Sequence, residues 1–241
     1  MDNKVFDRIE KKYLISDSQK KKILPLIKKH MKRDNYFKSE VFNIYFDTDN
    51  FDLINQSIDW TAFKYKLRAR SYGGYDRVFL EIKTKIRGKD NNPGFKRRVM
   101  ITHEDFNELV KHNKSMVELA ARSIETKDDL QIAKEVDYLI QNLNLKPKIM
   151  VSYNRQSYKG DDDLRITFDE NLMYRDMNLN FKKEIRDKIY FKDSQNIIME
   201  LKAQGSFPLW LVKKMSELKI YPQRFSKVGK AYELIRKENN V

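Results

Sequence analysis

The stretch Lys66-Leu67-Arg68-Ala69-Arg70 alternates basic and aliphatic residues, and Leu80-Glu81-Ile82-Lys83 alternates aliphatic and charged residues further along the chain. Successive side chains of a β-strand point to opposite faces of its sheet, so residues two apart share a face. In each stretch the charged side chains therefore share one face and the aliphatic side chains share the other. This pattern predicts neighbouring strands with one apolar face and one strongly charged face.

The same alternation recurs in the other strands that the sequence predicts. The residues that share a charged or polar face there are Arg8, Glu10 and Lys12; Lys96 and Arg98; Tyr153, Arg155 and Ser157; Arg165, Thr167 and Asp169; and Glu200 and Lys202. A half-exposed sheet also alternates, but its solvated face mixes both signs of charge. Neighbouring like charges cost about 1 to 4 kcal/mol per pair, depending on the effective dielectric constant. A polyanion that compensates these cations is therefore the expected ligand.

Period-2 alternation dominates the chain, with helical stretches between the strands. The expected strands are 5–15, 41–47, 63–71, 77–86, 95–101, 148–158, 163–170 and 196–202. The expected helices run from Ser16 or Asp17 to about Met31, over 103–112 and 126–143, from Pro208 to Lys219, and onward from Phe225. Eight or so antiparallel strands with peripheral helices predict an α+β fold whose sheet is a barrel or strongly curved. No repeat or linker divides residues 1–241, so we expect one domain.

The composition excludes several classes of protein. The 241 residues include 49 Lys plus Arg against 35 Asp plus Glu, which gives a formal charge of +14, and there is no Cys. Disulfides, thiolate nucleophiles and Cys-liganded zinc are excluded, and three His make a histidine-based site a poor hypothesis. The sequence shows no apolar run long enough to span a membrane and no signal peptide, so we expect a cytoplasmic protein.

Four carboxylates share the charged faces of the expected strands: Glu10, Glu81, Asp169 and Glu200. Hard oxygen ligands of this kind suit Mg²⁺ or Mn²⁺, and Mg²⁺ often takes one or two carboxylates together with substrate phosphates. The alternative is that each carboxylate pairs with a neighbouring Lys or Arg. Both interpretations remain open from the sequence alone.

Several motifs follow one another in an order typical of a known family. They are Arg8-Ile-Glu-Lys-Lys-Tyr13, Asn43-Ile-Tyr-Phe-Asp47, Lys66-Leu-Arg-Ala-Arg-Ser-Tyr72, Phe79-Leu-Glu-Ile-Lys-Thr-Lys85, Lys96-Arg-Arg98, Tyr153-Asn-Arg-Gln-Ser-Tyr158, Leu164-Arg-Ile-Thr-Phe-Asp169, Met199-Glu-Leu-Lys202 and Arg224-Phe-Ser-Lys227. Together they resemble the VTC (vacuolar transporter chaperone) polyphosphate polymerase branch of the CYTH, or triphosphate tunnel metalloenzyme, superfamily. The resemblance covers roughly residues 5–235. It implies an eight-stranded antiparallel tunnel that transfers the γ-phosphate of ATP to a growing inorganic polyphosphate chain.

The resemblance also implies roles for individual residues. Catalytic roles fall to Lys12, Arg68, Arg70, Lys83, Arg155, Arg165 and Lys227. Substrate binding falls to Arg8, Lys66, Lys85, Lys96, Arg98, Tyr153, Lys202 and Ser226. Glu200 would hold Mn²⁺ or Mg²⁺, with Glu10, Glu81 and Asp169 as further candidate ligands.

One departure from the family pattern bears on the reaction. Arg8 stands where the E-x-E-x-K signature has its first Glu, which favours a polymerase over a hydrolase, whereas Glu10 is retained. A triphosphatase of the same fold and a non-catalytic polyphosphate binder therefore remain as alternatives. No nucleic-acid motif is present, a direct membrane span is not expected, and a membrane-protein partner is left open. The lysine run 20–22 with Lys28 and Lys29 is interpreted as a solvated helix face, and helix 209–218 as a packing element.

Overall fold

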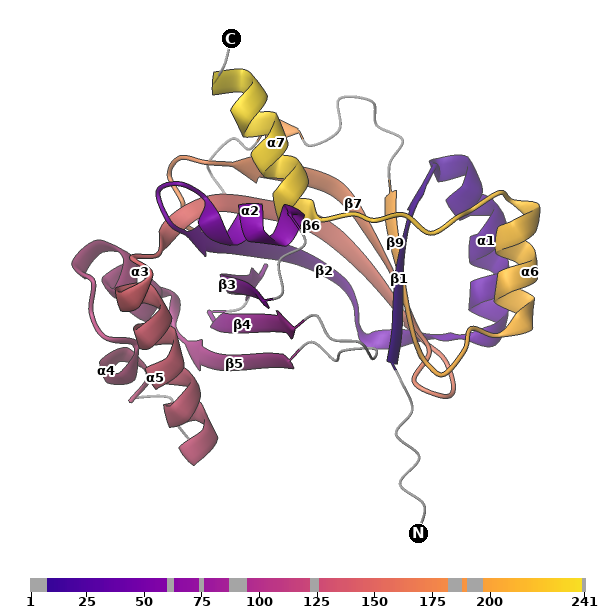
Figure 1. Ribbon diagram of the computed structural model, residues 1–241. Helices are drawn as coiled ribbons and strands as arrows, with labels where there is room; N and C mark the ends of the chain where they lie inside the picture. Colours follow the sequence, from indigo (N-terminus) through magenta and orange to yellow (C-terminus); the bar gives the residue numbers. More distant parts are fainter. Residues whose placement is uncertain are drawn as a thin grey trace. The chain divides into compact units, whose positions relative to one another are not determined.

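The computed structural model describes residues 8–59, 63–73, 76–86, 95–121, 126–181, 188–189 and 197–239 (Figure 1). Residues 5–7 of the first expected strand and residue 196 of the last lie outside these ranges. In the described part of the chain, no helix is long and apolar enough to cross a membrane.

The strands form one hydrogen-bonded sheet. Their bounds are β1 (Arg8–Ile15), β2 (Lys32–Asp47), β3 (Phe63–Tyr72), β4 (Val78–Ile86), β5 (Phe95–Ile101), β6 (Lys146–Lys159), β7 (Arg165–Arg175), β8 (Lys188–Ile189) and β9 (Ile197–Gln204). The strand order is β1-β9-β7-β6-β2-β3-β4-β5, and the short β8 pairs with β7. The pairs β1–β9, β7–β9, β2–β3, β3–β4 and β4–β5 are antiparallel. The antiparallel sheet of the predicted α+β fold is confirmed.

Helices α1 to α5 lie between strands in the sequence, and α6 and α7 follow the last strand. Their bounds are α1 (Asp17–His30), α2 (Asp52–Ile58), α3 (His103–His112), α4 (Met116–Ala120), α5 (Lys127–Asn142), α6 (Leu209–Glu217) and α7 (Lys227–Asn239). Ser16, Thr102 and Thr126 each form a capping box at the start of α1, α3 and α5. In a capping box, two backbone N–H groups that the helix leaves unpaired are satisfied reciprocally. These caps explain why the starts of the three helices could be predicted.

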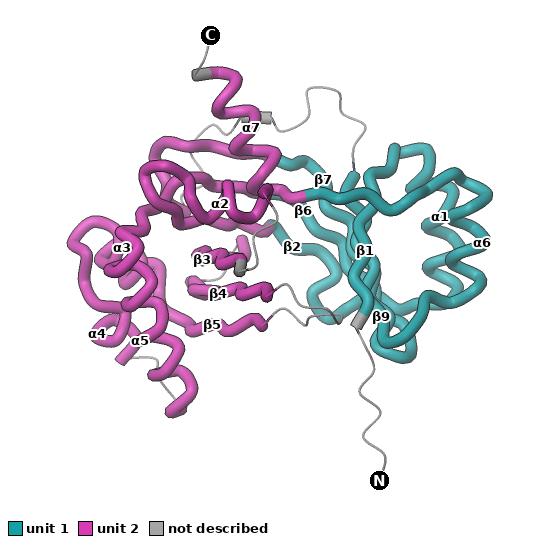
Figure 2. Tube along the Cα trace, in the orientation of Figure 1, with its two compact units in different colours: residues 1–40, 153–172, 189–225 teal, residues 41–152, 173–188, 226–241 magenta. Residues whose placement is uncertain are grey.

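The chain divides into two compact units (Figure 2). Unit 1 contains residues 1–40, 153–172 and 189–225, and unit 2 contains residues 41–152, 173–188 and 226–241. Strands β2, β6 and β7 each contribute residues to both units. The expectation of one domain over residues 1–241 stays a prediction.

In unit 2, one face of β3, β4 and β5 is buried in an apolar core with helices α3, α4 and α5. Leu67, Leu80, Ile82 and Val99 are at most 2% exposed and belong to the same cluster as Phe106 of α3. The cluster also contains Met116, Leu119, Ala133, Val136 and Ile140 from α4 and α5. Because the aliphatic residues of these strands take this face, the charged residues between them take the other.

Unit 1 has a separate core. Ile15 of β1, Phe168 of β7 and Met199 of β9 are buried in one cluster with Ile23 of α1 and Leu211 of α6. The apolar stripes of the two helices therefore pack on the apolar face of these three strands, which again leaves the alternate strand positions to charged residues.

The structure corrects three expectations about the elements. Strand β2 begins at Lys32, nine residues before the expected start at Val41. This part of the strand was not predicted because all side chains of 32–40 are exposed or half-buried, so it lacks the buried apolar residues that mark a strand in the sequence. Helix α2 was not expected. It is capped by a residue of the preceding strand, since the buried Asp47 carboxylate accepts the N–H groups of Leu53 and Ile54 at 2.9 Å each. The short helix α4 was also not expected.

A buried ion pair in unit 1 gives a test of this packing. The Lys20 ammonium contacts the Glu170 carboxylate, and their side chains are 11% and 25% exposed. Lys20→Ala leaves the half-buried carboxylate without this partner, so we expect the free energy of unfolding to fall by about 1 to 3 kcal/mol in urea titrations. The matched variant Lys21→Ala, at an exposed position of the same helix, should change it by less than about 0.5 kcal/mol. Equal effects of the two variants would show that the Lys20 pair does not stabilise unit 1.

Candidate functional site

The register of unit 2 brings cations directly opposite one another. Lys66 of β3 lies opposite Lys83 of β4, and Lys83 lies opposite Lys96 of β5. In the next row Arg68 lies opposite Glu81, which lies opposite Arg98. Like charges at directly opposed positions destabilise a sheet. Glu81 is the one carboxylate in the sequences of the three strands, so their charged face carries a strong excess of positive charge.

Glu81 is the centre of this face. Its side chain is 1% exposed, and its Oε2 accepts hydrogen bonds from Nε and Nη2 of Arg68 at 2.8 and 2.6 Å. Nε of Arg70 lies 3.8 Å from the same oxygen, and Nζ of Lys96 lies 2.5 Å from Oε1. A single buried carboxylate therefore contacts three cations from two strands.

The charges around Glu81 determine its ionisation. Burial raises the pKa of its carboxyl, but Arg68, Arg70 and Lys96 outweigh burial and lower that pKa to about 2. Burial also lowers the pKa of Lys96, and its pair with Glu81 opposes that shift without cancelling it. The carboxylate is thus ionised at every physiological pH and neutralises only part of the positive charge.

Tyr45 of β2 belongs to the same cluster. It lies opposite Arg68 in the sheet, is 8% exposed, and its hydroxyl oxygen accepts a hydrogen bond of 3.2 Å from Nη1 of Arg68. Burial raises the pKa of its phenol, but the charges of Arg68, Lys66 and Arg70 outweigh this and lower that pKa to about 8. The Arg68 guanidinium is therefore held between a phenol and a carboxylate.

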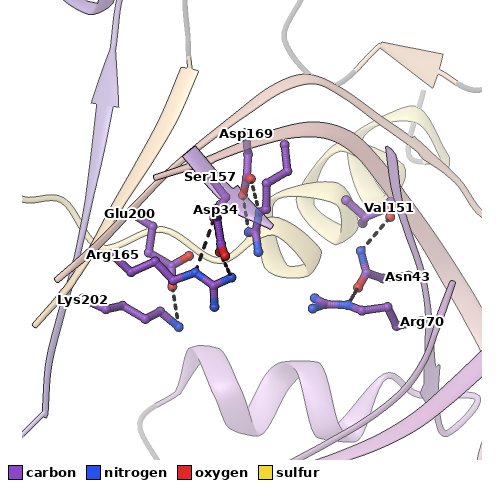
Figure 3. Close-up of polar contacts among 10 residues, drawn as sticks. Asp34, Asn43, Arg70, Val151, Ser157, Arg165, Asp169, Glu200 and Lys202 are labelled. Atoms are coloured by element: carbon purple, nitrogen blue, oxygen red, sulfur yellow. Dashed lines mark hydrogen bonds and ion pairs between the residues drawn. The ribbon is translucent and has the colours of Figure 1, made fainter. Parts of the chain in front are cut away.

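Asn43 fixes the neighbouring guanidinium. Its Oδ1 accepts a hydrogen bond of 2.8 Å from Nε of Arg70, and its Nδ2 donates to the carbonyl oxygen of Val151 at 3.2 Å (Figure 3). Arg70 is 7% exposed. Figure 3 shows the far side of the Arg70 guanidinium pointing away from Asn43. That side can therefore donate hydrogen bonds to other acceptors.

The first turn of α7 adds further positive charge to unit 2. Nζ of Lys66 lies 3.4 Å from Oγ of Ser226, and that oxygen accepts the N–H of Gly229 at 3.2 Å. Ser226 therefore caps α7, whose first turn contains Lys227 and no acidic residue. Backbone N–H groups at a helix start favour an anion, so Ser226 and Lys227 are suited to bind one.

In unit 1 the candidate cations Arg155, Arg165 and Lys202 are each paired with carboxylates. Arg155 donates to both oxygens of Asp169, from Nε at 2.6 Å and from Nη2 at 2.8 Å, and Asp169 is fully buried. Burial lowers the pKa of Arg155, but Tyr153 and Asp169 outweigh it and hold that pKa well above its usual value. The guanidinium also lies 5.3 Å from the centre of the Tyr153 ring.

Arg165 is paired with a residue that the sequence did not indicate. Its Nη2 contacts Oδ2 of Asp34, and its Nε donates to Oγ of Ser157 at 3.3 Å (Figure 3). Ser157 in turn donates to Asp34 at 3.2 Å. The Arg165 side chain is still 48% exposed, so it can also contact a ligand. Asp34 was not a candidate residue because it precedes the expected strand 41–47.

Two of the candidate metal ligands contact one ammonium group. Nζ of Lys202 lies 3.1 Å from Oε2 of Glu10 and 3.0 Å from Oε1 of Glu200. Lys12, which lies opposite Glu200 in the register, donates to the carbonyl oxygen of Phe225 at 3.2 Å. Among the described residues no group of three or more acidic or histidine side chains forms a complete metal cage. Glu10 and Glu200 nevertheless fit an ion that takes two carboxylates and completes its shell with phosphate oxygens.

The remaining candidate residues lie as the alternation predicts. Lys83, Lys85 and Arg98 are exposed, and the Arg98 guanidinium lies 4.7 Å from the centre of the Phe79 ring. The backbone of Arg8 pairs with Gln204 in β1–β9. Tyr45 and Asn43 were not among the expected site residues, although both share the charged face of the expected strand 41–47 and alternation could have identified them.

A substitution at Glu81 tests how the unit 2 charges are balanced. Glu81→Gln keeps the shape and leaves Arg68, Arg70 and Lys96 without their shared carboxylate, so we expect a loss of about 3 kcal/mol or more in the free energy of unfolding. Tripolyphosphate should stabilise this variant more than the parent protein, because it supplies the missing negative charge. The control is Glu135→Gln, which removes the exposed partner of Arg97. If tripolyphosphate stabilises the parent protein, Glu81→Gln and Glu135→Gln equally, the cations of this face do not bind it.

Tyr45 provides a spectroscopic test of the same charges. We expect Tyr45 to give a separate ionisation step near pH 8 in an ultraviolet titration. The early step should be absent in Tyr45→Phe, and tripolyphosphate should move it to higher pH by neutralising the neighbouring cations. Because the folded state lowers this pKa, its contribution to stability is complete above the unfolded value of 10.0 and is lost as the pH falls through about 8. An unchanged titration in the variant would contradict the assignment.

Comparisons with known proteins identify the family. A region of 144 residues, 55% of this chain, is 26% identical to vacuolar transporter chaperone complex subunit 4 of Schizosaccharomyces pombe and covers 20% of that protein. The match thus spans about a fifth of the length of this curated relative.

Two solved structures are similar to this chain over most of its length. One is described as the putative adenylyl cyclase HpAC1 from Hippeastrum with a dominant triphosphatase activity; it is 15% identical, with 92% of this chain and 93% of that chain covered and a TM-score of 0.51. The PH1819 protein of Pyrococcus horikoshii OT3 is 14% identical over 93% and 99% of the two chains, with a TM-score of 0.45. The first likeness shows a common fold, as the resemblance in the sequence implied. The family model of the VTC domain matches residues 7–236, and this chain therefore belongs to the VTC domain family.

Proposed function

We propose that this chain is a polyphosphate polymerase that transfers the γ-phosphate of ATP to a growing chain of inorganic polyphosphate, with Mn²⁺ or Mg²⁺. The observation that carries the proposal is the charged face of β3, β4 and β5. There Lys66, Lys83 and Lys96 stand opposite one another, and Glu81 is the one carboxylate in the three strand sequences. Membership of the VTC domain family supports a polymerase or triphosphatase reaction on this face.

The reaction requires little covalent chemistry from the protein. A terminal oxygen of the polyphosphate chain attacks the γ-phosphorus of ATP, the bond from that phosphorus to the β–γ bridging oxygen breaks, and ADP leaves with the bonding electrons. Phosphoryl transfer of this kind is catalysed mainly by positioning and by neutralising charge on the phosphate oxygens. A face of cations is suited to this task, and a chain without Cys can perform it.

In unit 2, we assign phosphate contacts to both kinds of cation. Arg68 and Arg70 present planar forks that match phosphate oxygens, and their orientation is fixed by Glu81 and Asn43. Lysines act as point charges on the same face. The residues assigned in this unit are Lys66, Arg68, Arg70, Lys83, Lys85, Lys96, Arg98, Ser226 and Lys227.

In unit 1, we assign phosphate contacts to Arg8, Lys12, Tyr153, Arg155, Arg165 and Lys202. The carboxylates Asp169 and Asp34 hold the guanidinium groups of Arg155 and Arg165 in place. Arg165 keeps the larger exposure of the two side chains, 48% against 23%. An incoming phosphate can therefore reach Arg165 without breaking a fully buried pair.

Glu10 and Glu200 are the residues that we propose to hold the divalent ion. When bound, such an ion neutralises charge on the phosphate oxygens as a Lewis acid. Lys202 contacts both carboxylates and occupies the position of a cation between them. Glu81 and Asp169 are less suitable ligands, because each is a buried carboxylate that already pairs with an arginine.

A triphosphatase activity is the second candidate, since Glu10 is retained and its carboxylate is 39% exposed. A binder of polyphosphate without turnover is the third. We further propose ATP or another nucleoside triphosphate as the donor, a cytoplasmic site of reaction, and an assembly with membrane proteins as the name of the curated relative suggests.

An assay with ATP and Mn²⁺ tests the proposal. The polymerase should release ADP and form acid-labile polyphosphate that is resolved by length on a gel. Arg68→Lys, which keeps the charge but loses the fork, and Glu200→Gln should each lower the rate about 100-fold or more. The readout for folding is the urea midpoint of each variant.

The matched control for this assay is Arg97→Ala. Arg97 lies next to Arg98 on β5, but on the other face of the strand, where its guanidinium contacts Glu135. The rate of this variant should stay within about twofold of the parent, because rate effects follow groups that contact the substrate. Orthophosphate and ADP without polymer would identify a triphosphatase. Stabilisation by polyphosphate without ADP release would identify a binder.

A further inference from the structure

Helices α1 and α6 of unit 1 form a surface that the proposed polymerase reaction does not use. They enclose a groove of about 520 Å³. Its lining includes Leu26 and Trp210, which are half-buried, and Lys22, Lys29 and Lys213, which are exposed. The imidazole of His30 stacks on the Trp210 indole at 4.4 Å and 12°, so the end of α1 is held against the start of α6. We refer to this surface as the α1–α6 face.

The α1–α6 face is strongly positive. Within the described ranges, no carboxylate forms an ion pair with Lys22, Lys29 or Lys213. Glu217, the acidic residue of the groove, is paired with Lys214 at 2.9 Å. Lys21 and Lys28 add two exposed cations on α1. The complementary surface must therefore be anionic.

Helix α6 also exposes large apolar side chains to solvent. Leu209 is 74% exposed and directly precedes Trp210, and Val212, two residues after Trp210, is 45% exposed. Side chains of this size are normally buried against the protein, as Leu211 and Met215 of the same helix are. The helix therefore presents apolar residues both to the core of unit 1 and to solvent.

The combination of these two features distinguishes the classes of anionic ligand. Free polyphosphate or a nucleic acid would contact the lysines but would gain nothing from Leu209 and Val212. An anionic phospholipid surface can contact both the lysines and the apolar side chains. Its phosphates accept hydrogen bonds from lysine ammonium groups, and leucine, valine and tryptophan enter the boundary between headgroups and acyl chains. Lysine side chains can extend their ammonium groups to the phosphates from beside such apolar residues.

We propose that the α1–α6 face docks this protein on the surface of an anionic phospholipid membrane. Lys22, Lys29 and Lys213 contact lipid phosphates, and Leu209 and Val212 enter the interfacial layer. Docking is peripheral, and it is independent of the residues assigned to phosphate transfer, so it can hold true whether or not the chain is a polymerase.

Sedimentation with vesicles tests the proposal. The full chain should bind vesicles of phosphatidylcholine that contain about 30% phosphatidylserine, and not vesicles of phosphatidylcholine alone. Each lysine near such a surface contributes about fivefold to binding, so Lys22→Glu, Lys29→Glu and Lys213→Glu together should lower it by about 100-fold or more. The matched control reverses three exposed lysines of unit 2 helices: Lys111→Glu, Lys127→Glu and Lys134→Glu. This control changes the net charge equally and should lower binding by less than about fivefold.

Tryptophan fluorescence tests the apolar part of the contact. In a Trp60→Phe background Trp210 is the one remaining tryptophan, and its emission should shift to the blue with the anionic vesicles. Leu209→Ser should weaken binding and reduce this shift while leaving the urea midpoint unchanged. The proposal is overturned if the protein stays in solution with anionic vesicles, if the control triple variant loses as much binding, or if the α1–α6 variant loses binding to long-chain polyphosphate but not to vesicles.

Discussion

The balance of charge around Glu81 is the constraint on which the rest of unit 2 depends. Strand alternation assigns the aliphatic residues of β3, β4 and β5 to a core with three helices, and this leaves their basic residues together on the other face. A sheet would not keep Lys66, Lys83 and Lys96 opposite one another without compensation. One buried carboxylate contacts three of the nearby cations but supplies a single negative charge, and a phosphate chain is the natural counter-ion for the remaining positive charge.

The two units differ in how far their cations are paired with carboxylates. In unit 1, Arg155 is paired with Asp169, Arg165 with Asp34, and Lys202 with Glu10 and Glu200. These pairs orient the cations in the absence of a ligand, which lowers the cost of ordering them when a ligand binds. In unit 2, the cations outnumber their partners, and the lowered pKa of Tyr45 reports the resulting positive potential. Each unit, taken by itself, is thus suited to bind phosphate: unit 2 by its excess of positive charge and unit 1 by its oriented cations.

Much of this arrangement could be predicted from the sequence, because period-2 alternation is a local signal. Strand β5 agrees with the prediction at both ends, and the starts of α1, α3 and α5 follow from Ser16, Thr102 and Thr126. Side-chain contacts that alternation does not encode could not be predicted. Helix α2 is capped by Asp47 of the preceding strand, and Arg165 is paired with Asp34 from 131 residues away. Nor could the sequence decide between metal binding and ion pairing for Glu81, whose contacts with three cations favour ion pairing.

The central claim is that the charged face of β3, β4 and β5 binds a phosphate chain. Calorimetric titration with tripolyphosphate of two neighbouring variants of β5 measures this most directly, because Arg98 belongs to that face and Arg97 to the opposite one. We predict that Arg98→Ala weakens binding about 10-fold or more, as expected for the loss of a charge-assisted contact, while Arg97→Ala binds as the parent does. Equal affinities of the two variants would contradict the account.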